Sequence, residues 1–142
     1  MQALLDTDCG IIMDIKVTHS KKGELNLPTK DKMLKAGLKS IDIIRKRTIY
    51  DHKDVSGKSF KPYTKEYKEY KQKKRPGFTG VDLQLTGRMF ANLKVKEHTK
   101  EKAVVGFSGI HAIKAFVNDK TRHFFALSKA ELRKIIKLVF GK

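Results

Sequence analysis

The chain has 142 residues, of which 39% are apolar, so it can build one compact domain but hardly two. No apolar run approaches the roughly 20 residues that cross a bilayer, which excludes the membrane-spanning class. The formal net charge is +17, and such a field attracts nucleic acid or an acidic protein surface without identifying which.

Residues 1–8 carry acidic groups where a secretory signal would carry basic ones, so we interpret them as part of a mature, cytoplasmically made protein. Cys9 is the single cysteine. It has no partner for an internal disulfide and no metal-ligand spacing, so we expect a small buried apolar residue. Apolar residues alternate toward the end of 11–17 and again in 24–27, which together predict a β-hairpin.

A long helix is predicted from Thr29, which offers an N-cap, to about Tyr50. Its apolar stripe is formed by four residues at helical spacing: Leu34, Leu38, Ile41 and Ile44. Gly37 lies at the edge of this stripe, where the missing side chain predicts close approach of another backbone.

Residues 51–80, which we call the excursion, are polar and contain several glycines and prolines, so they predict a long departure from the core. Within them, 64–75 predict a short lysine-rich helix with Tyr63, Tyr67 and Tyr70 near one face. Aromatic rings among lysines can stack on nucleic-acid bases. Alternatively, the tyrosines pack this helix onto the domain or a neighbouring subunit, which we favour because tyrosine is enriched at interfaces.

The chain becomes more apolar again after the excursion. Thr86 can cap a helical turn, and three apolar residues of this turn are expected to face inward: Met89, Phe90 and Leu93. Residues 93–96 and 103–107 flank a charged turn and predict a second hairpin. A short helix is predicted over 109–117, because Ile110, Ile113 and Phe116 or Val117 recur at helical spacing. The pair at 118–119 then predicts a turn.

The last predicted helix runs from 129 to about 140. Ser128 and Glu131 have the spacing of a capping box, and Leu127 with Leu132 that of a hydrophobic staple. Gly141 can end the helix. Its expected buried stripe consists of Leu132, Ile135, Ile136 and Val139. The predicted fold class is therefore α+β, one small domain over 1–142 in which antiparallel hairpins pack against a long helix of the N-terminal half and a C-terminal helix.

Three short segments resemble motifs of one protein family. The first matches at Gly57, Phe60, Pro62 and Tyr63, and the second at Leu83, Thr86, Gly87 and Met89. The closing segment matches at Val105, Gly106, Arg122, Phe124, Phe125, Ser128 and Glu131, with His123 where the family has a proline. In this order the segments resemble the phage virion-morphogenesis family, the tail-completion proteins of Mu-type phages and related neck proteins of long-tailed phages.

The resemblance implies a virion structural protein of the head-to-tail junction, made in the host cytoplasm and assembled as a ring of six or twelve copies. Its implied partners are other neck, connector and tail proteins, with DNA in the channel as a further contact. The helix from Tyr63 to Tyr70 and the hairpin from Leu93 to Phe107 are expected to contribute the ring contacts. The individual interface residues expected are Tyr63, Tyr67, Tyr70, Arg88, Met89, Phe90, Phe124 and Phe125. The residues expected to face channel DNA or acidic rings are Lys65, Lys68, Lys71, Lys73, Lys74 and Arg75.

The main alternative is a small basic nucleic-acid-binding protein that uses the lysine-rich excursion as its contact surface. A nuclease is a third hypothesis, but the sequence offers little for catalysis. The five histidines lie far apart, and there is no phosphate-binding loop, nucleophile elbow or acidic cluster. We therefore predict no enzymatic activity, cofactor or metal.

Overall fold

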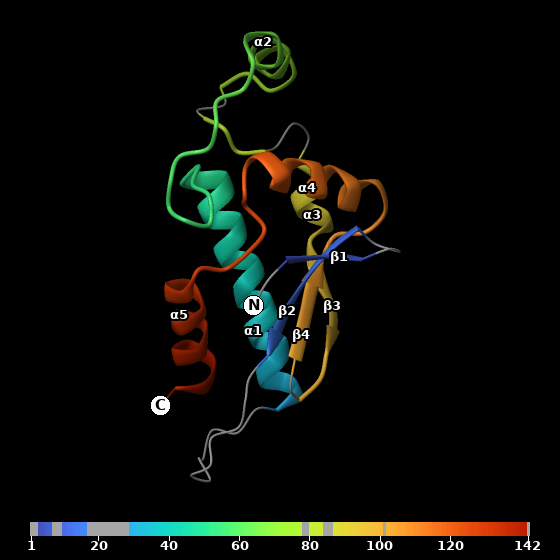
Figure 1. Ribbon diagram of the computed structural model, residues 1–142, viewed down its shortest axis with the longest axis vertical. Helices are drawn as coiled ribbons and strands as arrows, with labels where there is room; N and C mark the ends of the chain where they lie inside the picture. The colour runs from blue at the N-terminus through green and yellow to red at the C-terminus, as the bar shows by residue number, and fades with distance from the viewer. Residues whose placement is uncertain are drawn as a thin grey trace.

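A computed structural model describes residues 3–6, 10–16, 29–77, 80–83, 87–100 and 102–141. The architecture is α+β, as predicted, with an antiparallel sheet and helices packed around it (Figure 1). In chain order the elements are β1 (Ala3–Asp6), β2 (Gly10–Lys16), α1 (Lys30–Arg45), the π-helical turn η1 (Lys46–Tyr50), α2 (Lys65–Lys74), α3 (Arg88–Asn92), β3 (Lys94–His98), β4 (Lys102–Gly106), α4 (Gly109–Thr121) and α5 (Lys129–Phe140).

The four strands form one antiparallel sheet in the order β1-β2-β4-β3. The predicted strand at 11–17 is confirmed as β2, and the predicted second hairpin is confirmed as β3 with β4. The expected partner of the first strand, 24–27, lies outside the described residues. Within them, β2 pairs with β1 on one side and with β4 on the other, so the β1–β2 pair and the β3–β4 hairpin share one sheet.

The long helix begins where the sequence predicted, because the Thr29 side chain accepts a hydrogen bond from the backbone N–H of Lys32 at 3.1 Å. It continues through η1 to Tyr50. The buried face differs from the predicted stripe, since Leu38 is half exposed. The buried residues of α1 are Met33, Ala36, Gly37, Ser40, Ile41 and Ile44.

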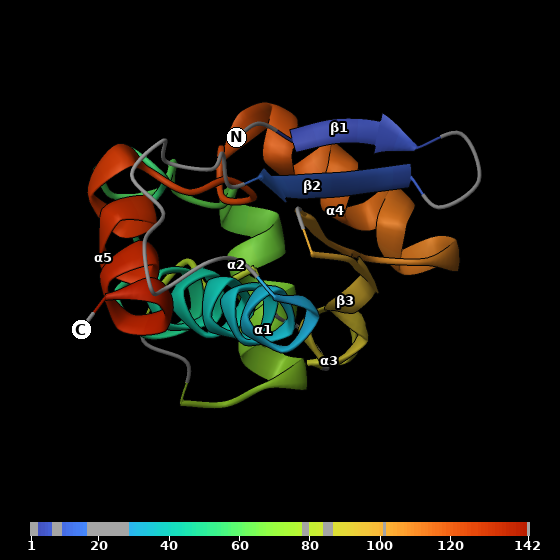
Figure 2. The ribbon, with the colours of Figure 1, turned by 90° about the horizontal axis from the view of Figure 1, so that it is seen from below.

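Gly37 permits the close packing of α1 on the sheet. A Cβ at this position would lie 2.9 Å from Cγ2 of Val95 in β3 and 3.4 Å from Cβ of Ala103 in β4. The predicted close approach is therefore present, but it is made by side chains of the sheet. Figure 2 shows α1 and α5 side by side, where they also contact one another.

Four phenylalanines lie at the centre of the core, with neighbouring ring centroids 5.2–6.3 Å apart: Phe90, Phe107, Phe124 and Phe125. Met89 is buried in the same cluster. The expectation that Met89, Phe90, Phe124 and Phe125 form a subunit interface is wrong, because their side chains have almost no exposed surface. The inward orientation predicted for Met89, Phe90 and Leu93 is confirmed. The N-cap of α3 is Gly87, and Thr86 lies outside the described residues.

The turn predicted at 118–119 is wrong, because α4 continues to Thr121. The Asn118 side-chain amide donates to the carbonyl oxygen of Lys114 and so stays on the helix surface. The capping box of α5 is confirmed, with Ser128 Oγ accepting from Glu131 N and Glu131 Oε1 accepting from Ser128 N. The predicted stripe of α5 is partly wrong, since Ile135 is buried but Ile136 is exposed.

Candidate interface on the α2 excursion

A tight turn opens the excursion. The Asp54 carboxylate accepts hydrogen bonds from the backbone N–H of Ser56 and Lys58, both at 2.9 Å, and from the Ser56 hydroxyl at 2.7 Å. Slight burial acts to raise the pKa of Asp54, but the hydrogen bonds from Ser56 and Lys58 outweigh it and hold this pKa below its usual value. Gly57 completes the turn with φ = +86°, a conformation that favours glycine.

The segment after α4 fastens the excursion to the domain. The guanidinium of Arg122 donates to the carbonyl oxygens of Lys61 at 2.9 Å and Pro62 at 3.2 Å, and it lies 5.0 Å from the centroid of the Tyr63 ring. The backbone N–H of Val55 donates to the carbonyl oxygen of His123. These contacts join two segments about 60 residues apart in sequence.

A buried polar network fixes α2 itself. The Lys71 side chain is fully buried, where it forms an ion pair with Asp82 and donates to the Tyr63 hydroxyl at 3.1 Å. Arg75, which is partly exposed, reaches the other Asp82 oxygen at 3.3 Å. The Tyr63 hydroxyl also accepts from the backbone N–H of Leu83, a residue with φ = +58°. Because bulky residues rarely adopt this φ, the surrounding contacts must stabilise the local backbone.

The three sequence motifs therefore meet in space. Tyr63 of the first motif contacts Leu83 of the second and Arg122 of the closing one. Phe60 and Leu83 belong to the same hydrophobic core as Met89, Phe124 and Phe125. The residues that carry the resemblance thus act mainly as scaffold, and they determine where α2 lies.

Lys71 is not available as a contact residue for DNA or a partner, which corrects the sequence expectation. The Tyr63, Tyr67 and Lys71 positions are spaced four apart, so a helical projection would have placed the lysine beside the tyrosines. No motif or spacing in the sequence indicated a role for Asp82. Four of the six predicted contact residues have exposed side chains, namely Lys65, Lys68, Lys73 and Lys74.

Two tyrosines and a lysine form the exposed surface that we call the tyrosine–lysine face: Tyr67, Tyr70 and Lys74. Tyr67 is 38% exposed and Tyr70 47%. The Tyr67 ring packs against Tyr63 at 4.8 Å and Tyr70 at 6.2 Å between centroids, and the Lys74 amine lies 5.9 Å from the Tyr70 centroid. Burial, followed by the neighbouring Tyr63 and Tyr70, raises the pKa of Tyr67. Since the rings pack against one another, less of each ring is open for stacking on bases.

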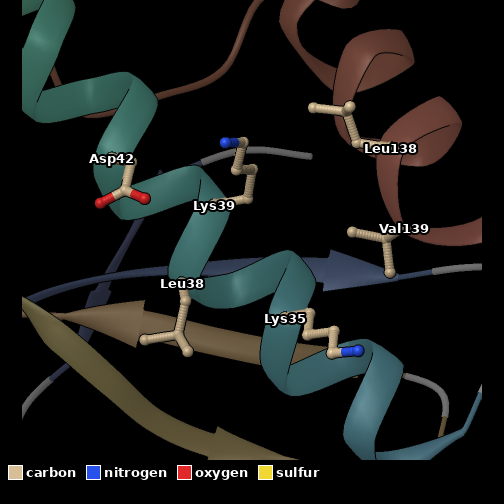
Figure 3. Close-up of a pocket in the computed structure, with 6 residues that line it drawn as sticks. All are labelled: Lys35, Leu38, Lys39, Asp42, Leu138 and Val139. Carbon is tan, nitrogen blue, oxygen red and sulfur yellow. The ribbon is translucent and has the colours of Figure 1, made fainter.

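A second surface lies between α1 and α5. This shallow groove, the α1–α5 groove, is lined by Lys35, Leu38, Lys39, Asp42, Leu138 and Val139. Figure 3 shows Leu138 and Val139 extending from α5 toward α1. Leu38 and Leu138 are each at least half exposed, so the groove presents apolar surface beside charges of both signs.

The β3–β4 hairpin contributes less surface than the sequence suggested. Most of β4 is buried. The β3 strand forms one edge of the sheet, but its pairing is interrupted by a register shift between Val95 and Glu97, and Lys94 and Glu97 are exposed on it. Bulges and charges of this kind discourage strand pairing with another chain.

In the described part of the chain, no group of three or more His, Cys, Asp or Glu side chains could hold a metal ion. No helix among the described residues is long and apolar enough to cross a membrane. No protein-family model, curated protein or solved structure matches the chain. Function must therefore be argued from the chain's own residues and from its motifs.

Proposed function

We propose that the chain is a structural subunit of a phage head–tail junction, a neck or tail-completion protein that assembles as a ring of six or twelve copies. The motifs supply the family resemblance. The observation that carries the proposal is the tyrosine–lysine face, which the excursion holds at one end of the molecule (Figure 1). Half-exposed tyrosines fixed by a buried ion pair suit a contact between proteins, since little side-chain entropy is lost on binding.

A closed ring needs two different patches on each subunit. The tyrosine–lysine face is one, and we assign the α1–α5 groove as the other. Lys74 of the tyrosine–lysine face and Asp42 of the groove carry opposite charges, so an ion pair can form between the two patches. Apolar contact of the tyrosines with the half-exposed leucines would supply the central buried area.

Exposed lysines of the excursion would face channel DNA or acidic neighbouring rings. The same lysines, with the net charge of +17, favour the second candidate function, a small nucleic-acid-binding protein. Mutual packing of Tyr63, Tyr67 and Tyr70 leaves less ring surface for stacking on bases, so we rank this function second.

The test is quantitative protein composition of purified particles from the phage or prophage that carries the gene, with antibody labelling. A constant copy number near six or twelve and label at the neck are expected. Absence from intact particles would refute the proposal. Salt-steep binding of the free protein to DNA would then support the alternative.

A matched pair of variants tests the tyrosine–lysine face. Tyr67→Ala with Tyr70→Ala should leave the fold intact but reduce joined particles in a complementation assay. Tyr50→Ala removes an equally large tyrosine that is 75% exposed outside the face and should have no effect. Equal particle yields from both variants would show that the tyrosine–lysine face is not part of the interface.

A further inference from the structure

The α4 helix is packed with its small side chains inward and its large ones outward. Ala112 and Ala115 are buried, and α4 contacts β2 and α3. Three branched side chains point to solvent instead and are 60–63% exposed: Ile110, Ile113 and Val117. We call these three residues the α4 ridge. Their spacing of i, i+3 and i+7 places them on one helical face over about 10 Å, which is the arrangement of anchors in helix-mediated recognition.

The exposed charged side chains that α4 itself places near the α4 ridge are lysines. Lys114 is exposed on the same helical face, four residues after Ile110 and three before Val117. Lys120 lies one turn further, with its amine 4.7 Å from the centroid of the Phe116 ring. The only carboxylate of α4, Asp119, accepts from the backbone N–H of Phe125 and so serves the fold. On its outer face α4 thus carries lysine beside the apolar anchors and no carboxylate of its own.

The lysines beside the α4 ridge indicate what kind of partner binds there. In a two-fold contact between α4 helices of two copies, both Lys114 side chains would lie near the axis and repel each other. Three aliphatic residues provide little anchorage for a lipid surface, and the neighbouring Phe116 ring is partly buried against the core. A partner that places apolar side chains on the α4 ridge and carboxylates beside Lys114 satisfies both features of the surface.

We infer that the α4 ridge docks an acidic amphipathic helical segment of a different protein. The surface is separate from the tyrosine–lysine face and the α1–α5 groove, and the inference does not depend on the head–tail assignment. The anchors are Ile110, Ile113 and Val117, and Lys114 pairs with a carboxylate of the partner.

A displayed library of helical peptides of about 20 residues, unbiased in charge, tests the inference on the full-length protein. Selection on the wild type is preceded by counter-selection on a ridge variant, Ile110→Ser/Ile113→Ser/Val117→Ser, which keeps every charge. Enriched peptides are then measured by fluorescence anisotropy. Circular dichroism checks that the variants fold, which is expected because all three side chains are exposed.

Enriched peptides should be net acidic with apolar residues at helical spacing, and the ridge variant should bind them about tenfold or more weakly. Lys114→Glu should weaken binding about fivefold, whereas Lys134→Glu, an equal charge change on exposed α5, should have a much smaller effect. Equal binding to the wild type and the ridge variant, or enriched peptides without acidic excess, would overturn the inference. Ridge-dependent dimerisation in sedimentation, or ridge-dependent binding to anionic phospholipid vesicles, would also overturn it by assigning another occupant.

Discussion

The buried ion pair of Lys71 and Asp82 gives the most direct test of how the excursion is held. Lys71→Met removes the ammonium but keeps an unbranched side chain of similar length, so little cavity forms. It leaves the Asp82 carboxylate, which is 8% exposed, with Arg75 as a cationic partner at 3.3 Å. Asp82→Asn does the converse and leaves a buried ammonium beside the Tyr63 hydroxyl.

Breaking one side of a buried ion pair costs about 3–5 kcal/mol, because the remaining charge is desolvated without compensation. Arg75 and Tyr63 soften this cost, so we expect each single substitution to lower the free energy of unfolding by about 3 kcal/mol. The double variant Lys71→Met/Asp82→Asn removes both charges, so no charge of the pair is left buried without its partner. Its loss should be no larger than that of either single variant, which corresponds to a coupling energy of about 3 kcal/mol.

The chain is suited to a site-specific assay, since it has four tyrosines and no tryptophan. Three of the tyrosines, Tyr63, Tyr67 and Tyr70, lie in or beside α2. In a Tyr50→Phe background, tyrosine emission during urea unfolding therefore reports on the excursion, while far-ultraviolet circular dichroism reports on all helices. Linear extrapolation of each transition gives the free energies for the double-mutant cycle.

Lys68→Met is the matched control, because this lysine is exposed on the same helix. It should change the free energy of unfolding by no more than about 0.5 kcal/mol. Two results would refute the reasoning. One is a Lys71→Met loss as small as that of the control. The other is additivity of the two single losses in the double variant.

Three further predictions concern packing, capping and ionisation. Gly37→Ala should lower the free energy of unfolding by about 1–2 kcal/mol, because the added Cβ would lie 2.9 Å from Val95. Urea unfolding of the double variant with Val95→Ala should show that part of this loss is recovered. An increase in stability from Gly37→Ala alone would contradict the close packing. Ser128→Ala should lower the thermal unfolding midpoint by an amount equivalent to about 1 kcal/mol, since it removes one hydrogen bond of the capping box, and an unchanged midpoint would count against that role. Because the pKa of Tyr67 is raised, its contribution to stability is complete below the ordinary tyrosine pKa and is lost as the pH rises through the folded value. Tyrosinate absorbance should show a group that titrates above the ordinary tyrosine pKa and that disappears in Tyr67→Phe.

Much of the candidate interface could be located from the sequence, but the sequence did not show which of its side chains pair with one another and are buried. Helical spacing was enough to predict α2 and its line of tyrosines. The sequence could not show that Asp82 would pair with Lys71, because this pairing depends on the path of the loop that follows α2. Consequently a residue expected to contact DNA is part of the scaffold.

The sequence by itself determined the α+β class, the start of α1, the capped α5 and the β3–β4 hairpin, because these follow from caps, periodicity and turns within a few residues of each other. Tertiary structure alone decided which face each helix buries. Periodicity placed Ile110 and Ile113 on one face of α4, yet the sheet accepts Ala112 and Ala115 on the opposite face. It likewise decided that Phe124 and Phe125 belong to the core and that Leu38 stays at the surface. Burial depends on the shape of the neighbouring layer, which a local pattern does not contain.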